Sequence, residues 1–189
     1  MKNILFALLA AFLLIGCGSN ATDNQNIEPK LVVGKTLNNL TFDDQFGKSH
    51  TLSPNTYKLV FAFAKAPAHI CNDFFDTKPD DYLAKHNAEF IADVSAAPSL
   101  IRSMFVLPGL KELKHTVLVI NDRAVAAPYR KGMDTEKIVV VSIINKKITD
   151  IKTISTAEEL QKTLEDDSPI SILAPMINEA LDTANNMMK

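Results

Sequence analysis

The 189-residue chain contains no tryptophan, only six glycines and only two cysteines. Two cysteines cannot form the framework of a disulfide-rich scaffold, and so little glycine excludes collagen-like and low-complexity chains. The chain also lacks a long basic run and has a net charge of −2, so we expect no nucleic-acid partner. With 47% hydrophobic and 22% charged residues, the composition is that of a globular protein of one domain with accessory segments.

No apolar run is long enough for a transmembrane helix. The longest, residues 4–15, follows Lys2 and falls short of the ~20 residues that a hydrocarbon core of ~30 Å requires. It has the length of a signal-peptide core and ends in Leu14-Ile15-Gly16-Cys17. This tetrapeptide resembles the lipobox of bacterial lipoproteins, which implies a signal peptide over residues 1–16 and a lipid on Cys17. The alternative is an ordinary secretory signal that contains a cysteine by chance.

The lipoprotein resemblance also implies a location. Gly18 follows Cys17, and the Asp that retains proteobacterial lipoproteins in the inner membrane is absent from that position. We therefore expect a protein anchored to the membrane through its N-terminal lipid, in the outer membrane and facing the periplasm. Polar residues 17–30 predict a flexible tether. Residues 166–189 predict a C-terminal helical extension, which packs on the domain or binds a partner.

The pattern of residues 31–165 predicts an α/β fold with a mixed sheet and helices on both of its faces. The continuous apolar stretch at residues 58–64 is typical of a central strand. Other strands are expected at residues 40–42, 49–52, 89–94 and 116–121, and a hairpin at residues 137–144 and 147–154. Helices are expected at residues 71–87, within residues 97–114 with a break at Pro108-Gly109, and at residues 156–164 after a Thr156/Glu159 capping box.

Two segments carry a resemblance to a known superfamily. VGKTLNNLTFDDQFGKSHTLS at residues 33–53, with KLVFAFA at residues 58–64, resembles the opening of the redoxin branch of the thioredoxin-like superfamily. The segment FIADVS at residues 90–95 resembles the strand that follows the active-site helix of that family. The resemblance implies a thioredoxin-like domain over residues 31–165. In this family the nucleophilic cysteine stands at the start of the helix after the central strand, where the helix dipole lowers its pKa.

Cys71 is the candidate nucleophile that the resemblance implies, since Pro79 stands eight residues later, as in thioredoxins. Phe74 occupies the position of the second cysteine, so Cys71 cannot form an internal disulfide. Ala68 and Ala64 occupy the positions where peroxiredoxins hold a hydroxyl and a proline, so full peroxidase activity is not expected.

The peroxide-polarising arginine of the peroxiredoxins has two nearby candidates here, Arg123 and Arg130. His69 forms a His-x-Cys pair with Cys71 on an expected loop at residues 65–70. It is an exposed loop histidine, an aid to the Cys71 thiolate, or half of a soft-metal site. The other histidines lack ligand spacing, so we predict no metal site and no cofactor.

The thiol itself has two interpretations: a reactive group with a modestly lowered pKa, or a small buried packing residue. Three functions remain open. The first is a lipid-anchored module without dithiol redox activity that binds or assembles envelope proteins. The second is a monothiol oxidoreductase or weak peroxidase using Cys71. The third, a metallochaperone using His69 and Cys71, has only two ligands in view.

Overall fold

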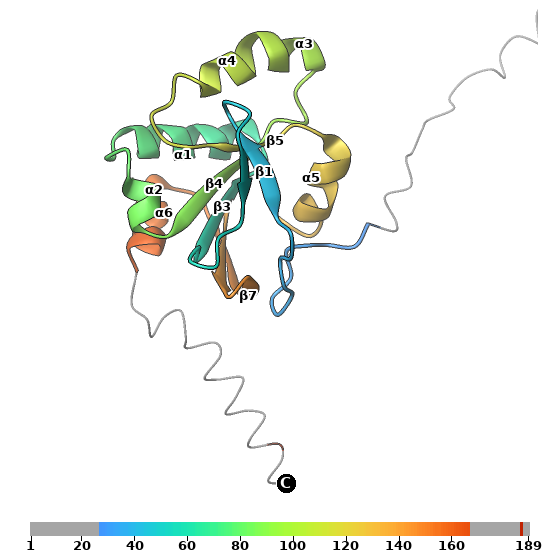
Figure 1. The fold of residues 1–189 in the computed structure, drawn as a ribbon, viewed down its shortest axis with the longest axis vertical. Helices are drawn as coiled ribbons and strands as arrows, with labels where there is room; N and C mark the ends of the chain where they lie inside the picture. Colours follow the sequence, from blue (N-terminus) through green and yellow to red (C-terminus); the bar gives the residue numbers. More distant parts are fainter. Residues whose placement is uncertain (1–26, 167–185, 187–189) are drawn as a thin grey trace, which may run out of the picture.

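The computed structural model describes residues 27–166 and Asn186 (Figure 1). The predicted signal peptide, Cys17 and most of the tether lie outside the described residues, as does nearly all of the C-terminal extension. Within the described part, no helix is both long enough and apolar enough to cross a membrane.

Seven strands form one mixed sheet in the order β2-β1-β5-β4-β3-β6-β7. Their bounds are β1 Thr41–Asp44, β2 Ser49–Thr51, β3 Lys58–Ala62, β4 Ala88–Asp93, β5 Leu118–Ile120, β6 Ile138–Ile144 and β7 Lys147–Ile154. The central strand β3 is parallel to β4, which is parallel to β5. The pairs β3–β6, β6–β7, β1–β5 and β1–β2 are antiparallel.

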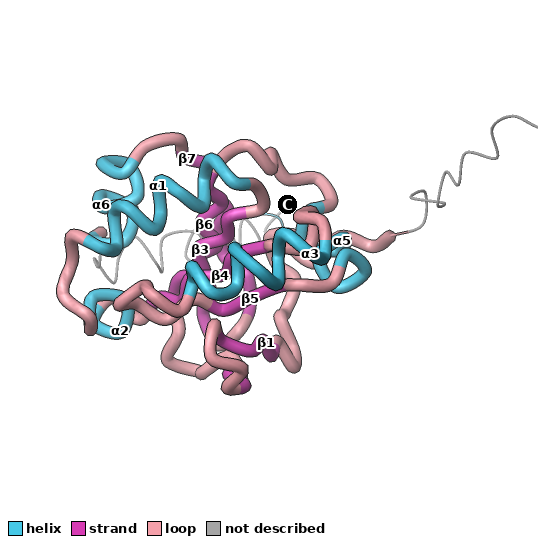
Figure 2. Tube along the Cα trace, turned by 90° about the horizontal axis from the view of Figure 1, so that it is seen from above, coloured by secondary structure: helices cyan, strands magenta, loops and turns pink. Residues whose placement is uncertain are grey.

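Helices cover both faces of this sheet (Figures 1 and 2). Their bounds are α1 Lys65–Asp76, α2 Tyr82–Lys85, α3 Ser99–Ile101, the π-helix η2 Arg102–Val106, α4 Leu107–Leu110, α5 Arg123–Arg130 and α6 Ala157–Glu165. Side chains of α1, α4 and α6 share one apolar cluster, whereas those of α5 and of the chain before β1 share the other. The predicted α/β class, with a mixed sheet between two helical layers, is confirmed.

Strand β3 divides the two clusters, and all five of its residues are buried. Val60 and Ala62 belong to the cluster under α1, while Leu59 and Phe61 belong to the cluster under α5. This alternation follows from the two-residue period of a strand, and it explains why the strand is apolar on both faces. Lys58 is buried at its amino end, where its Nζ donates to the carbonyl oxygens of Thr163 and Leu164 at 2.6 and 3.0 Å, near the C-terminus of α6.

Several local predictions are confirmed. Asn145 and Lys146, with φ of +49° and +67°, connect β6 to β7; positive φ at both central residues is the geometry that favours tight hairpins. The capping box of Thr156 and Glu159 starts α6.

The predicted helix over residues 71–87 is wrong. Helix α1 begins at Lys65 and ends at Asp76, and Pro79 lies in the connection to α2 rather than inside a helix. The expected loop at residues 65–70 is the first half of α1. Pro67 stands in the first helical turn, where its missing N–H removes no hydrogen bond, so this proline is compatible with a helix start.

Three further features differ from the expectation. The helical stretch through α3, η2 and α4 runs from Ser99 to Leu110 without the expected break, and Pro108 stands in its last turn, just after the π-helix η2. Helix α5 was not anticipated. It begins after Asp122, whose side chain accepts hydrogen bonds from the first turn, and it continues through Pro128. Strand β5 is shorter than the apolar stretch suggested.

Candidate functional site

The carboxyl ends of the parallel strands β3, β4 and β5 lie at one edge of the sheet. Helix α1 starts at this edge after β3, the segment leading to α3 leaves β4, and α5 starts there after β5. Open α/β sheets bind their ligands at such an edge, since the connecting segments converge there. The resemblance in the sequence points to the same edge.

The first turn of α1 contains Lys65, Ala66, Pro67 and Ala68, after Ala64 as N-cap. None of these side chains is a thiol or a hydroxyl, and Ala64 provides no side-chain cap. The helix end still presents free backbone N–H groups toward this edge. The position where the resemblance places a nucleophilic cysteine therefore holds neither a thiol nor a hydroxyl.

Cys71 lies in the middle of α1, six residues after the helix begins, and it is completely buried. Its neighbours in the apolar cluster include Phe74 and Phe75 of the same helix. Burial raises the pKa of the Cys71 thiol far above its usual range. The expectation of a thiol at the helix start with a modestly lowered pKa is thus wrong, because the helix starts earlier than the sequence suggested.

His69 is exposed on α1 rather than on a loop. Because residues two apart on a helix do not face one another, His69 and the buried Cys71 are not placed as a pair. Among residues 27–166, no three histidine, cysteine or acidic side chains lie together in a way that could hold a metal ion.

Helix α5 carries both predicted arginines to the segment that leaves β4. Arg123 donates from Nε to the Ser95 carbonyl and from Nη2 to the Ala96 carbonyl, both at 3.2 Å. Arg130 Nη1 lies 3.5 Å from Oδ2 of Asp93, whose side chain is fully buried. The structure therefore brings the two arginines together, and their polar partners are residues 93–96 rather than Cys71.

Arg102 of η2 joins this group and was missed by the sequence analysis. Its Nη1 donates to the carbonyls of Ser95 and Ala97, both at 3.3 Å. A cavity of about 290 Å³ lies between residues 95–102, which lead into α3 and η2, and residues 121–123 at the start of α5. Its lining includes Ser95, Pro98, Ser99, Arg102, Asn121, Asp122 and Arg123. The sequence feature that could have indicated a role for Arg102 is its position as a single cation within a mostly apolar helical stretch.

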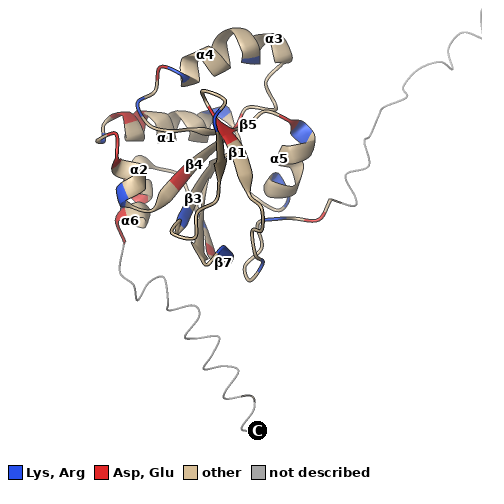
Figure 3. Ribbon diagram, viewed as in Figure 1, with Lys and Arg blue, Asp and Glu red and all other residues tan. Residues whose placement is uncertain are grey.

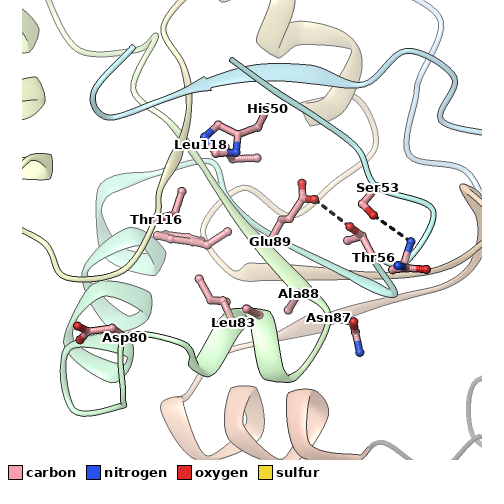
Figure 4. Close-up of a pocket in the computed structure, with 13 residues that line it drawn as sticks. His50, Ser53, Thr56, Asp80, Leu83, Asn87, Ala88, Glu89, Thr116 and Leu118 are labelled. Carbon is pink, nitrogen blue, oxygen red and sulfur yellow. Dashed lines mark hydrogen bonds between the residues drawn. The ribbon is translucent and has the colours of Figure 1, made fainter. Parts of the chain in front are cut away.

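A second cavity of about 380 Å³ lies near the amino ends of β4 and β5 (Figure 4). Glu89 lines it and accepts a 2.8 Å hydrogen bond from the Thr56 hydroxyl. Burial raises the pKa of the Glu89 carboxyl above its usual value. His50 also lines this cavity, but its Nε2 is engaged with Asp44 Oδ2 at 2.8 Å. Glu89 and His50 thus both have partners within the fold.

His115 is buried beside α1, with its Nε2 3.3 Å from Asn72 Oδ1 and its ring near those of Phe75 and Phe90. Burial lowers the pKa of His115 to about 4, so the imidazole is neutral at physiological pH. Together with the aromatic rings, it forms the inner packing surface of α1.

No protein-family model matches the sequence, and no curated protein matches it. Among solved structures, the chain is similar to peroxidoxin BcpB from Mycobacterium tuberculosis, with 18% identity, coverage of 70% of this chain and 93% of the other, and a TM-score of 0.47. It is also similar to the mitochondrial 2-Cys peroxiredoxin from Plasmodium falciparum, with 12% identity, 74% and 96% coverage, and a TM-score of 0.47.

A third similar structure is the exposed lipoprotein thioredoxin from Streptococcus pneumoniae, with 15% identity, 68% and 98% coverage, and a TM-score of 0.46. Likenesses at this level concern the fold and carry no statement about activity. The α/β fold class predicted from the sequence, with a mixed sheet between helices on both faces, is the one that the structure has.

Proposed function

We propose that this protein is a lipid-anchored, thioredoxin-like module of the bacterial envelope that binds other proteins and has no dithiol redox activity. The observation that carries the proposal is the composition of the carboxyl edge. The first turn of α1 offers no thiol there, whereas Arg102 and Arg123 line a cavity at the same edge. This arrangement supports recognition rather than thiol chemistry.

The burial of Cys71 also supports the proposal. A thiolate is the reactive form of cysteine, and a thiol whose pKa is raised by burial forms little thiolate at neutral pH. A single thiol, moreover, cannot resolve its own mixed disulfide with a substrate. Reduction of a protein disulfide by this chain would need both an opening of the core and a second thiol from elsewhere.

Catalytic assays of the full chain test the redox half of the proposal. We expect no turnover in reduction of insulin disulfides and none in consumption of hydrogen peroxide with dithiothreitol present, both measured against a thioredoxin and a peroxiredoxin as positive controls. The Cys71→Ala variant should behave like the unsubstituted chain. Multiple turnovers that disappear in Cys71→Ala would establish the monothiol enzyme instead.

Lipid anchoring is tested separately at Cys17. The lipobox resemblance predicts that a radiolabelled or alkyne-tagged fatty acid is incorporated into the chain in a bacterial host and that Cys17→Ser abolishes the incorporation. Detergent-phase partitioning should change in parallel. Unchanged lipid labelling of Cys17→Ser would remove the lipoprotein assignment and the outer-membrane location with it.

A further inference from the structure

We propose that the helix through α3, η2 and α4, together with the start of α5, is a docking surface for a segment of another protein that carries apolar side chains and one carboxylate. The inference rests on the proposed function, since it assigns a partner chemistry to the same edge of the sheet. It rests on two features that lie side by side: an exposed apolar strip and the cavity lined by Arg102 and Arg123.

The strip consists of four large apolar side chains, with exposed fractions of 64% for Leu100, 45% for Ile101, 58% for Met104 and 64% for Phe105. Their spacing of one, four and five residues places them on one face of the helix. Other residues of the same helix, Leu110 above all, pack into the core. A surface helix normally has one apolar face, which packs on the core. A second apolar face that is exposed to solvent indicates an interaction surface.

Few charges interrupt this strip. Figure 3 shows the helix at α3 and α4 almost entirely in tan, with one blue segment, while α5 beside the edge carries further blue. The stretch between α3 and α4 is π-helical, at residues Arg102–Val106. Single π-helical turns occur frequently at functional sites.

A further exposed apolar side chain lies at the start of α5. Val125 is 45% exposed and lines a small cavity with Asn121 and Asp122, and these two residues also line the cavity of Arg102 and Arg123.

The arginines have donors to spare. A guanidinium has five N–H donors, and the partners of Arg102 engage only Nη1, while those of Arg123 engage Nε and Nη2. Nε and Nη2 of Arg102 and Nη1 of Arg123 have no partner within the described part of the chain. Asp122 is the acidic residue in the described lining, and its Oδ1 is occupied by the N–H groups of Ala124 and Val125. The surplus positive charge fits a carboxylate, which guanidinium groups bind with two parallel hydrogen bonds.

A protein segment fits this surface better than a lipid bilayer. Helices that lie on membranes carry several lysines or arginines along the polar face, whereas the cation within this helix, Arg102, is held by two backbone carbonyls. A side-chain carboxylate can enter a cavity of about 290 Å³ that a flat bilayer surface cannot fill. Membrane binding and pairing with a second copy are therefore outcomes that the test must separate.

The test uses the full chain in nanodiscs of neutral phosphatidylcholine and a fluorescein-labelled peptide with the central sequence Leu-Phe-Asp-Leu-Phe, read by fluorescence anisotropy. Matched peptides replace the central Asp with Asn or Lys. We expect the Asp peptide to bind at least about tenfold more tightly than the Asn peptide, because a charge-assisted hydrogen bond is lost. The preference should weaken as salt is added.

Variants separate the two features of the surface. Phe105→Ser should weaken all three peptides, whereas Arg123→Gln should reduce the preference for Asp over Asn and leave the binding of the Asn peptide unchanged. Lys111→Gln, an exposed cation just after α4, is the matched control and should bind like the unsubstituted chain. All three positions are exposed or at the surface, and unchanged thermal unfolding verifies that each variant is folded.

Three results would overturn the docking surface as described. Equal affinity for the Asp and Asn peptides would contradict the proposed recognition of a carboxylate. Absence of binding by all three peptides would contradict the proposed docking of a peptide segment. The third result is that no peptide binds, while the chain binds phosphatidylglycerol vesicles or associates with itself and Phe105→Ser abolishes that binding. The apolar strip would then be a contact surface for a membrane or for a second copy of the chain. Peroxide consumption is measured on the same preparations, so that redox turnover contradicts the proposed function without altering the peptide data.

Discussion

Two regions at the same edge of the sheet differ in what they offer to another molecule. The first turn of α1 exposes Lys65 and Ala66 and offers no thiol or hydroxyl, and the thiol of Cys71 further along that helix is buried. The corner between η2 and α5 presents arginine side chains around a cavity, beside four exposed apolar residues. The first region thus offers no thiol, while the second combines guanidinium donors with exposed apolar side chains.

The strands place both regions at the carboxyl edge, and that placement depends on the buried core rather than on any reactive group. Burial of Cys71 contributes to the core, and the arginines brace the segment after β4 through its carbonyls. The four predictions below test this contrast, from the largest expected effect to the smallest.

The largest effect is expected when a thiol is placed in the first turn of α1. Ala66→Cys in a Cys71→Ala background puts a cysteine at an exposed first-turn position, where the helix dipole favours the thiolate. We expect it to react with iodoacetamide at pH 7 at least about a hundredfold faster than native Cys71. Asp73→Cys in the same background, exposed but further along the helix, should react at an intermediate rate. Equal rates for Ala66→Cys and native Cys71 would contradict the contrast.

The next effect concerns the ion pair between Arg130 and the buried Asp93. Arg130→Ala leaves the carboxylate of Asp93, fully buried, without its ion-pair partner. We expect a loss of about 2–3 kcal/mol in the free energy of unfolding, measured in urea, since an uncompensated buried charge is costly. Arg123→Ala is the matched control and should cost less, because Arg123 is exposed and binds only carbonyl groups. A larger loss of unfolding free energy for Arg123→Ala than for Arg130→Ala would contradict the view that Arg130 compensates the buried charge of Asp93.

A third effect depends on pH and involves the inner surface of α1. The pKa of His115 is about 4 in the folded chain, against about 6.5 when unfolded. Between these values the unfolded state binds more protons, so stability is lost as the pH falls from about 6.5 to about 4, by at most about 3 kcal/mol. Urea unfolding across this range should show the loss.

The control for that experiment is His115→Gln, which removes the titrating group. Glu89 acts in the opposite sense, because its raised pKa means that the folded state takes up a proton first as the pH falls. The difference between the two chains at each pH therefore isolates His115. A difference that does not vary with pH would mean that the imidazole is not buried in its neutral form.

The smallest effect is expected at Ser95. Its side chain is buried, and its hydroxyl has no hydrogen-bond partner within the described residues. Ser95→Ala removes an unsatisfied polar group, so we expect unchanged stability or a gain of up to about 1 kcal/mol. Ser99→Ala, at an exposed position nearby, is the comparison. A loss of more than about 1 kcal/mol relative to Ser99→Ala would indicate a hydrogen bond that the structure lacks.

The sequence predicted the features that short stretches encode. The apolar run of β3, the hairpin turn at Asn145 and Lys146, and the capping box at Thr156 were confirmed in place. Each depends on the period of a strand, on a left-handed turn, or on a pair of capping side chains, and all three signals lie within a few residues.

The features that the sequence did not predict depend on the position of proline or on distant residues. Pro108 stands inside the helical stretch from Ser99 to Leu110, where the sequence suggested a break, and Pro128 stands inside α5, for which no helix was predicted. Helix α1 begins at Lys65 rather than at Cys71, where the resemblance placed the helix start. Arg102 of η2 and Arg123 of α5 both donate to the carbonyl of Ser95 after β4. These residues are distant in the sequence, so no local pattern predicts that they lie together.

The reactivity of Cys71 in the native chain tests the central claim most directly. In Cys17→Ser, where Cys71 is the sole cysteine, alkylation by iodoacetamide at pH 7 is followed from zero to denaturing urea. We predict that labelling tracks unfolding, with native Cys71 protected in proportion to the stability of the domain. Labelling in the absence of urea at the rate of the unfolded chain would contradict the buried thiol, and with it the absence of thiol chemistry.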